Sequence, residues 1–174
     1  MGNVIIYQYN DELILFTFAY LMKKQLLYII LISLLIFTSC KPKHFYNEFK
    51  TVDVKKWKST DTLTYTVDIE DAKPEYNVSI SIRYQKDYEF SNIWLSVIDT
   101  YDNENKTVRV EVPLFKKDGK PYGKKSGSFC TQTIPYQYRT RFPKAGKYKL
   151  SIVQLMRKDP IGGISDVGVI IDKK

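Results

Sequence analysis

The sequence predicts an all-β fold: a single antiparallel β-sandwich that follows an N-terminal lipoprotein signal peptide. Apolar and polar residues alternate with a period of two in short segments separated by turn residues, which is typical of half-buried strands. No segment after the signal shows the apolar period of an amphipathic helix of three turns. The spacing fits a jelly-roll or an immunoglobulin-like strand order equally well.

The signal peptide is predicted over residues 22–39, with Cys40 as the residue that carries the lipid. A Met-Lys-Lys start is followed by an apolar run over residues 25–37 and by the small residues Thr-Ser before the cysteine. The alternative is a transmembrane anchor in which the cysteine is incidental, but this run is shorter than the roughly 20 apolar residues that span a bilayer. Two or more acyl chains on Cys40 would hold the protein on a membrane.

The rest of the chain divides around this signal. Residues 1–21 contain polar and acidic positions and are interpreted as a mis-assigned upstream extension of the signal. Residues 40–58 are expected to be a lipidated tether and N-terminal segment, with aromatic residues that fold back onto the domain. Residues 59–174 are long enough for one β-sandwich domain with its own core and too short for two domains.

The strands are expected where the alternation is clearest. Residues 93–100 are more continuously apolar than the other segments, which suits a central strand. A glycine-rich loop is expected over residues 116–127. The expected strands are residues 63–69, 78–84, 93–100, 108–112, 129–133, 136–142, 148–152 and 167–171.

Composition limits the partners. The formal net charge is +8, but a protein exported beyond the inner membrane does not meet nucleic acid as its function. An anionic lipid surface or an acidic protein is a more suitable partner for a basic surface. If Cys40 is acylated, Cys130 has no disulfide partner in the chain, and we expect it to be a buried thiol that packs as a small apolar side chain.

The residue inventory argues against an enzyme. The single histidine, His44, lies four residues after the anchoring cysteine, so the domain has no Ser-His-Asp or Cys-His arrangement. The sequence has no zinc-ligand spacing and no phosphate-binding glycine loop, and we expect no metal and no cofactor. A hydrolase that uses two carboxylates remains a third and weaker hypothesis, because no particular pair stands out.

The many aromatic residues support an alternative function, a glycan-binding lipoprotein. A row of exposed aromatic rings on one face would carry such a function, whereas buried rings would only fill the core of a sandwich. The candidate aromatic residues are Tyr84, Tyr88, Phe90, Trp94, Tyr136 and Tyr138.

One loop between two strong strands is a candidate partner-binding site. Arg157, Lys158 and Asp159 lie in it, and Ser165 and Asp166 follow it. Loops on rigid scaffolds often carry function. The alternative is structural: the two glycines before Ser165 serve a tight turn, and Ser165 and Asp166 bond to the backbone.

A series of motifs covers the domain from about residue 45 to the end. No single motif is specific, but their order and spacing are. The motifs are Tyr46 and Trp57, then Tyr-Glu-Phe-Ser-Asn-Ile at 88–93, Pro-Leu at 113–114, Asp-Gly-Lys-Pro-Tyr-Gly at 118–123, Arg-Phe-Pro at 141–143, Gln-Leu-Met-Arg at 154–157 and Gly-Ile-Ser-Asp-Val-Gly at 163–168. In these motifs the chain resembles the gliding motility lipoprotein GldH family of Bacteroidota.

The resemblance implies a non-enzymatic, lipid-anchored component of the cell envelope. Its partners would be the membrane and other envelope proteins of gliding motility and type 9 secretion. Of the functional positions, only Cys40 carries over, as the site of lipid attachment. The Lys-Pro-Lys-His that follows Cys40 lacks the acidic residues usual in surface-exported lipoproteins of these bacteria. We therefore expect the periplasmic face of the outer membrane.

Overall fold

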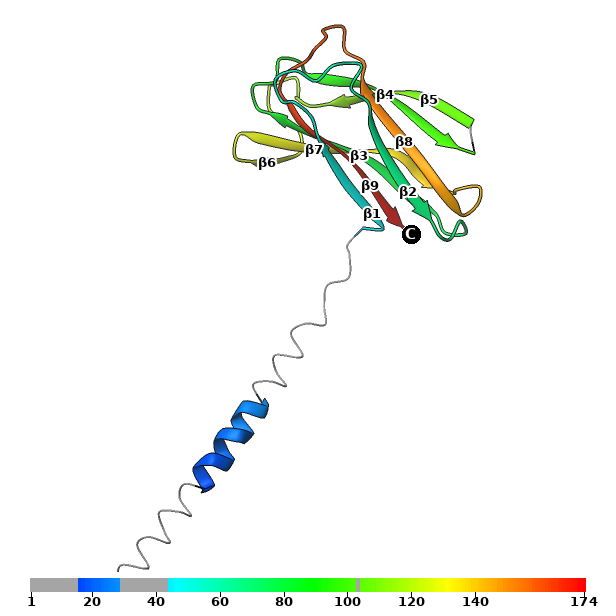
Figure 1. Cartoon of the computed structure of the whole chain (residues 1–174). Helices are drawn as coiled ribbons and strands as arrows, with labels where there is room; N and C mark the ends of the chain where they lie inside the picture. Colours follow the sequence, from blue (N-terminus) through cyan, green and yellow to red (C-terminus); the bar gives the residue numbers. More distant parts are fainter. Residues whose placement is uncertain (1–15, 29–43, 103) are drawn as a thin grey trace, which may run out of the picture. The chain divides into compact units, whose positions relative to one another are not determined.

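The computed structural model describes residues 16–28, 44–102 and 104–174 (Figure 1). Residues 16–28 form a helix that crosses the boundary expected between the upstream extension and the signal peptide. Among these described residues, no helix is long and apolar enough to cross a membrane. Cys40 and most of the apolar run lie outside the described residues. The chain from Lys43 to Lys174 forms one compact unit.

Two antiparallel sheets pack face to face in this unit, as the alternating pattern predicts (Figure 1). One sheet has the order β1-β9-β3-β7-β6, and the other has the order β2-β8-β4-β5. The strands are β1 (Tyr46–Thr51), β2 (Leu63–Ile69), β3 (Tyr76–Gln85), β4 (Asn92–Tyr101), β5 (Glu104–Pro113), β6 (Lys124–Ser126), β7 (Phe129–Thr140), β8 (Gly146–Gln154) and β9 (Ile164–Lys173).

The pairing decides between the two strand orders that the sequence left open. β4 pairs with β5, β3 with β7, β2 with β8 and β1 with β9, so the pairs are nested inside one another along the chain. A long antiparallel hairpin wrapped into two sheets gives this nesting, which is the jelly-roll arrangement. The short β6 is an addition at the edge beside β7.

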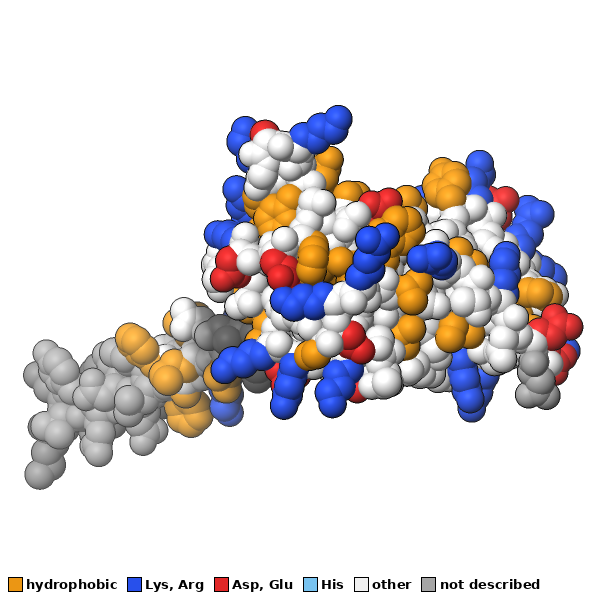
Figure 2. Space-filling view, turned by 90° about the horizontal axis from the view of Figure 1, so that it is seen from above, with side chains coloured by type: hydrophobic (Ala, Val, Ile, Leu, Met, Phe, Trp, Pro, Cys, Tyr) orange, Lys and Arg blue, Asp and Glu red, His pale blue; other side chains and the backbone are white. Residues whose placement is uncertain are grey.

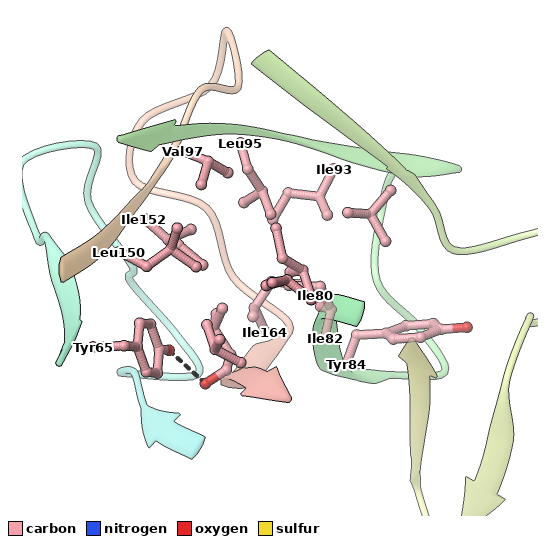
Figure 3. Close-up of a cluster of buried hydrophobic side chains, with 14 of the residues drawn as sticks. Tyr65, Ile80, Ile82, Tyr84, Ile93, Leu95, Val97, Leu150, Ile152 and Ile164 are labelled. Atoms are coloured by element: carbon pink, nitrogen blue, oxygen red, sulfur yellow. Dashed lines mark hydrogen bonds between the residues drawn. The ribbon is translucent and has the colours of Figure 1, made fainter. Parts of the chain in front are cut away.

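Alternation along the strands builds the core between the sheets. In β2 the burial pattern changes at every residue, with Tyr65, Val67 and Ile69 buried and Thr66 and Asp68 between them exposed. Figure 3 shows the isoleucines of β3 and the aliphatic side chains of β4 in one buried cluster. Because each strand presents one apolar face, the two sheets bury these faces against each other.

Two tyrosines of the core bond their hydroxyl groups to backbone. Tyr65 of β2 donates to the carbonyl of Val167 in β9 at 2.7 Å, which links the two sheets (Figure 3). Tyr84 donates toward the carbonyls of Leu114 and Tyr122 at 2.6 and 2.7 Å. Burial raises the pKa of Tyr84 to about 12. Large rings therefore fill the core without leaving an unbonded hydroxyl.

The structure changes three expected boundaries. Residues 129–133 and 136–142, expected as two strands, are parts of the single strand β7. Pro135 lies inside it and is tolerated because β6 covers only residues 129–131, so the other edge of β7 is open at the proline. Residues 124–126 of the expected loop form β6, and β1 pairs with β9, so the sandwich begins ahead of residue 59.

The two ends of the sandwich carry different connections. We call one end the tether pole, because the chain enters the domain there: β1 begins, β2 and β9 end, β7 leads to β8, and β4 turns into β5 at this end. His44 Nδ1 lies 2.7 Å from Asp172 Oδ1 there, joining the start of the domain to its last strand. At the distal pole, residues 155–163 connect β8 to β9 (Figure 1).

Candidate functional site

The loop that the sequence singled out lies at the distal pole. Arg157 and Lys158 are exposed at its tip, and Lys158 Nζ pairs with Glu89 Oε1 at 2.7 Å. Asp159 is exposed as well, but its carboxylate bonds within the molecule. Its carboxylate accepts hydrogen bonds from Ser59 N at 2.9 Å, Ser59 Oγ at 2.6 Å and Gln154 Nε2 at 3.0 Å. These hydrogen bonds hold the pKa of Asp159 below its usual value.

The base of this loop is fixed to the β1–β2 connection. The backbone N–H of Trp57 bonds to the carbonyl of Ile161 at 2.9 Å, and the reverse bond is 3.0 Å long. Both side chains are almost fully buried, and Gly163 N donates to the carbonyl of Val54. The loop therefore presents its tip from a rigid base.

Ser165 and Asp166 lie at the start of β9, on the sheet and away from the loop tip. Ser165 Oγ donates to Asp166 Oδ2 at 2.8 Å and approaches the carbonyl of Arg83 at 3.2 Å. Asp166 also accepts from Thr51 Oγ1 at 2.8 Å. These bonds join neighbouring strands, so the side chains of Ser165 and Asp166 make their contacts within the sheet. They do not form one site with Arg157 and Lys158.

Basic residues gather around the loop tip in a cluster that we call the distal basic patch. Its members are Lys55, Lys56, Lys58, Arg157 and Lys158, all exposed. Figure 2 shows Lys and Arg side chains spread over this face of the domain, with Asp and Glu side chains among them. Among the described residues, the only ion pair of this patch is that of Lys158 with Glu89.

Three lysines of this patch, Lys55, Lys56 and Lys58, were not predicted from the sequence. They lie in a Lys-Lys-Trp-Lys run about 100 residues before the loop. The backbone pairing of Trp57 with Ile161 brings the two segments together. The signal in the sequence was the run itself. A tryptophan between lysines indicates a segment that buries the tryptophan in the domain and exposes the lysines to solvent.

A pocket of about 380 Å³ opens at the tether pole between the two sheets. Its inner side is aliphatic, and its exposed lining residues belong to the start of β5, the β7–β8 connection and β8. The volume falls within the range of small-ligand pockets. The buried aliphatic residues are Val67, Val78, Leu150, Val169 and Ile171.

A carboxyl group lies in this pocket. Asp99 follows Val97 by two residues on the inward face of β4, where an apolar residue would continue the alternation. Its Oδ2 accepts hydrogen bonds from Tyr136 Oη at 2.8 Å and from Gln137 Nε2 at 3.1 Å. Desolvation by burial raises the pKa of Asp99, and the hydrogen bond from Tyr136 and the charge of Lys106 oppose this rise.

A β-bulge in β7 lets two consecutive residues reach the same carboxylate. Ser79 of β3 pairs with Pro135 and its neighbour Val78 pairs with Gln137, so Tyr136 is an extra residue. In a regular strand Tyr136 and Gln137 would point to opposite faces. Bulges redirect side chains in this way and are frequent beside functional sites. The period-two pattern of the sequence does not reveal them.

The aromatic residues proposed for glycan binding do not form an exposed row. Tyr84 and Tyr88 are buried in the core. Trp94 lies partly exposed on β4 with Arg109 beside its ring, and Tyr136 bonds to Asp99. Of the six candidates only Tyr138 is largely exposed, at 72%.

The remaining candidates for a reactive or metal-binding group are Cys130 and clusters of ionisable residues. Cys130 is free and fully buried, as the sequence predicts. In the described part of the chain, no three His, Cys, Asp or Glu side chains lie close enough together to hold a metal ion. Cys40, the predicted lipid site, lies outside that part.

The sequence profile described as GldH lipoprotein matches residues 44–171, which is most of the chain and nearly all of the sandwich. The chain belongs to the GldH lipoprotein family. This confirms the resemblance inferred from the ordered motifs. In the GldH sandwich the motifs fall at both poles: Arg-Phe-Pro at 141–143 borders the pocket, and Gln-Leu-Met-Arg at 154–157 leads into the distal loop.

Two GldH relatives match along most of their length. The chain is 28% identical over 155 residues to the gliding motility lipoprotein GldH homolog of Christiangramia forsetii, with 84% of this chain and 94% of the relative covered. It is 27% identical over 154 residues to gliding motility lipoprotein GldH of Flavobacterium johnsoniae, with 84% and 95% covered. A lipoprotein family agrees with the signal predicted before Cys40.

Solved structures resemble the GldH sandwich only distantly. A family GH115 4-O-methyl-α-glucuronidase matches with a TM-score of 0.41 and 11% identity, over 78% of this chain and 18% of that enzyme. A family 35 carbohydrate-binding module from an environmental isolate matches with a TM-score of 0.39 and 13% identity, over 78% of this chain and 86% of the module. We draw no functional argument from similarities at this level.

Proposed function

We propose that this GldH protein is a lipid-anchored, non-enzymatic component of the cell envelope that docks acidic surfaces of gliding motility and type 9 secretion proteins through its distal basic patch. Cys40 carries the lipid, and the protein acts on the periplasmic face of the outer membrane. The observation that carries this proposal is the arrangement of the two poles. The chain enters the domain at one pole, and the basic loop lies on a rigid base at the other.

Charge supports an acidic protein as the partner. Four of the five cationic side chains of the patch have no ion pair among the described residues. The nearby carboxylates of Asp53, Asp61 and Asp159 accept hydrogen bonds from neutral donors of the domain and, in the described part of the chain, form no ion pair with these cations. They keep their negative charge and lower the net positive charge of the patch. A patch of this kind steers an acidic partner toward itself, and salt weakens the attraction.

A crosslinking capture from native envelopes tests this function. Wild type is compared with Arg157→Glu/Lys158→Glu and with Cys40→Ala, and the control is Lys124→Glu/Lys125→Glu on β6, which makes the same change in charge. We expect wild type and the β6 control to capture motility or secretion proteins, and the two other variants to lose them.

The outcomes separate the two parts of the proposal. Equal capture by wild type and the loop variant would show that docking does not use the patch. Retention of Cys40→Ala in the membrane fraction would remove the lipid anchor from the proposal. Binding of polysaccharide by wild type with no protein captured would replace docking by the glycan-binding function.

A further inference from the structure

The pocket lies at the pole where the tether enters the domain. Phe45, the residue before β1, packs edge-on against Tyr76, with 5.3 Å between ring centroids. Tyr76 packs against Phe142 at 5.2 Å, and Phe142 lines the pocket. Two ring contacts therefore connect the entry of the chain with the border of the pocket.

Chain length limits how far this pole lies from the lipid on Cys40. Cys40 is five residues before Phe45. Since an extended chain spans at most about 3.6 Å per residue, their Cα atoms are no more than about 18 Å apart. A lipid anchor at Cys40 thus keeps the tether pole, with its pocket, close to a membrane surface.

The lining of the pocket has an apolar side and a polar side. Toward β2, β3, β8 and β9 it consists of the five buried aliphatic side chains. Asp99, Tyr136 and Gln137 lie on the side of β4 and β7, with the exposed start of β5 beyond them. A ligand that fits has an apolar part for the inner side and polar atoms near the mouth.

One cation on the rim of the pocket has no ion pair among the described residues. Lys106 lies opposite Asp99 across β5 and β4, so its side chain stands on the same face of the sheet as Asp99. Arg141 is already paired with Glu75 at 3.3 Å. The acidic groups that line the pocket are Glu104 on the exposed rim and Asp99 within. The unpaired Lys106 favours an anionic group at its side of the mouth.

We propose that this pocket takes one acyl chain of an anionic lipid from the membrane that holds Cys40, with the chain against the aliphatic side chains and the headgroup against Lys106. This inference rests on the lipid anchor of the proposed function. The pocket then secures the domain to the membrane at a second point, beside the covalent lipid. Two attachments fix the orientation of the domain and direct the distal basic patch away from the membrane.

Photo-crosslinking in the full-length protein tests the occupant. Phe142 is replaced by p-benzoylphenylalanine, the protein is irradiated in native envelopes, and the mass of the adduct is measured. The control carries the same probe at Tyr138, which is on β7 and 72% exposed. We expect a lipid adduct from position 142 and none from position 138. A peptide, a sugar, the acyl group of Cys40 itself or no adduct at position 142 would each overturn the proposal.

Charge reversal at the rim gives a second, independent measurement. Lys106→Glu changes an exposed side chain, so it leaves the core intact, and Lys124→Glu on β6 is the matched control. We expect Lys106→Glu to lower the yield of lipid adduct at least about tenfold, and the control to leave it unchanged. Equal yields from both variants would show that Lys106 does not hold a headgroup and would overturn the proposed headgroup site.

Membrane fractionation of the same samples separates this inference from the proposed function. Protein in the membrane fraction without a lipid adduct at position 142 overturns the pocket ligand and leaves the anchor intact. Protein recovered in the soluble fraction overturns both.

Discussion

Tyr136 donates a hydrogen bond to Asp99 Oδ2 at 2.8 Å and so joins β7 of one sheet to β4 of the other. Gln137 donates to the same oxygen at 3.1 Å. Burial disfavours the charged carboxylate more than these donors and Lys106 favour it, so the pKa of Asp99 is raised in the folded protein. A neutral side chain of the same shape would avoid this cost.

Asp99→Asn is therefore expected to raise the free energy of unfolding at pH 7. The amide oxygen can accept both existing hydrogen bonds, because both end on one carboxylate oxygen. Since the folded pKa lies above the unfolded one, wild type loses stability as the pH rises through the window between these two values. Urea unfolding at pH 4 and pH 7 measures the difference between variant and wild type.

The control for this pH dependence is Asp118→Asn, because Asp118 is exposed and its hydrogen bond from Lys120 holds its pKa below the usual value. Its contribution has the opposite sign: it is present above the unfolded pKa and is lost as the pH falls through the folded pKa. If Asp99→Asn and wild type differ by the same amount at both pH values, the carboxyl group does not titrate with a raised pKa.

Trp57→Ala is expected to lower the free energy of unfolding by about 3–5 kcal/mol, the usual cost of removing a buried aromatic side chain. Trp57 is 1% exposed, and its Nε1 donates to the carbonyl of Asp61 at 3.1 Å. Trp94→Ala is the matched comparison, because Trp94 lies partly exposed on β4. Urea unfolding of both variants should show a clearly smaller loss at Trp94. Equal losses would contradict a special role of Trp57 in fixing the distal pole.

The sandwich could be predicted because its strands obey one simple rule. Val78, Ile80 and Ile82 alternate with polar or smaller residues, and the structure places the isoleucines in the core. The long-range pairing of β1 with β9 could not be predicted, because strands with the same alternating pattern fit several partners equally well. The proline in β7 also misled the prediction, because its tolerance depends on which edge of the strand is open.

The sites were predicted less completely for a different physical reason. Arg157 and Lys158 could be singled out because a loop between two strong strands is visible in the sequence. The pocket could not, since Asp99 and Tyr136 come from different sheets and meet only through a bulge. One signal was present: Asp99 occupies an inward position directly after the alternating Ile93, Leu95 and Val97. A carboxylate at such a position indicates either a partner or a pocket.

Cys130 is expected to react with a thiol reagent only after the domain unfolds. Its side chain is fully buried on β7, and the reagent must reach the thiolate. Labelling of the Cys40→Ala variant, in which Cys130 is the single thiol, is measured with and without urea. We expect no labelling of the native protein and complete labelling in urea. Rapid labelling without urea would contradict the burial of this residue.

Gly163→Ala is expected to destabilise the protein more than Gly119→Ala, although both glycines have positive φ values, +84° and +77°. Each substitution costs about 1–2 kcal/mol because an L-residue is unfavourable in this conformation. At Gly119 the new methyl group meets nothing within 4 Å, whereas at Gly163 it would lie 2.9 Å from Tyr88 Cδ2. Tyr88 is buried, so its ring has little room to move, and this contact adds about 1–3 kcal/mol. Urea unfolding of the two variants isolates the contact with Tyr88, and equal losses would show that its ring moves aside without cost.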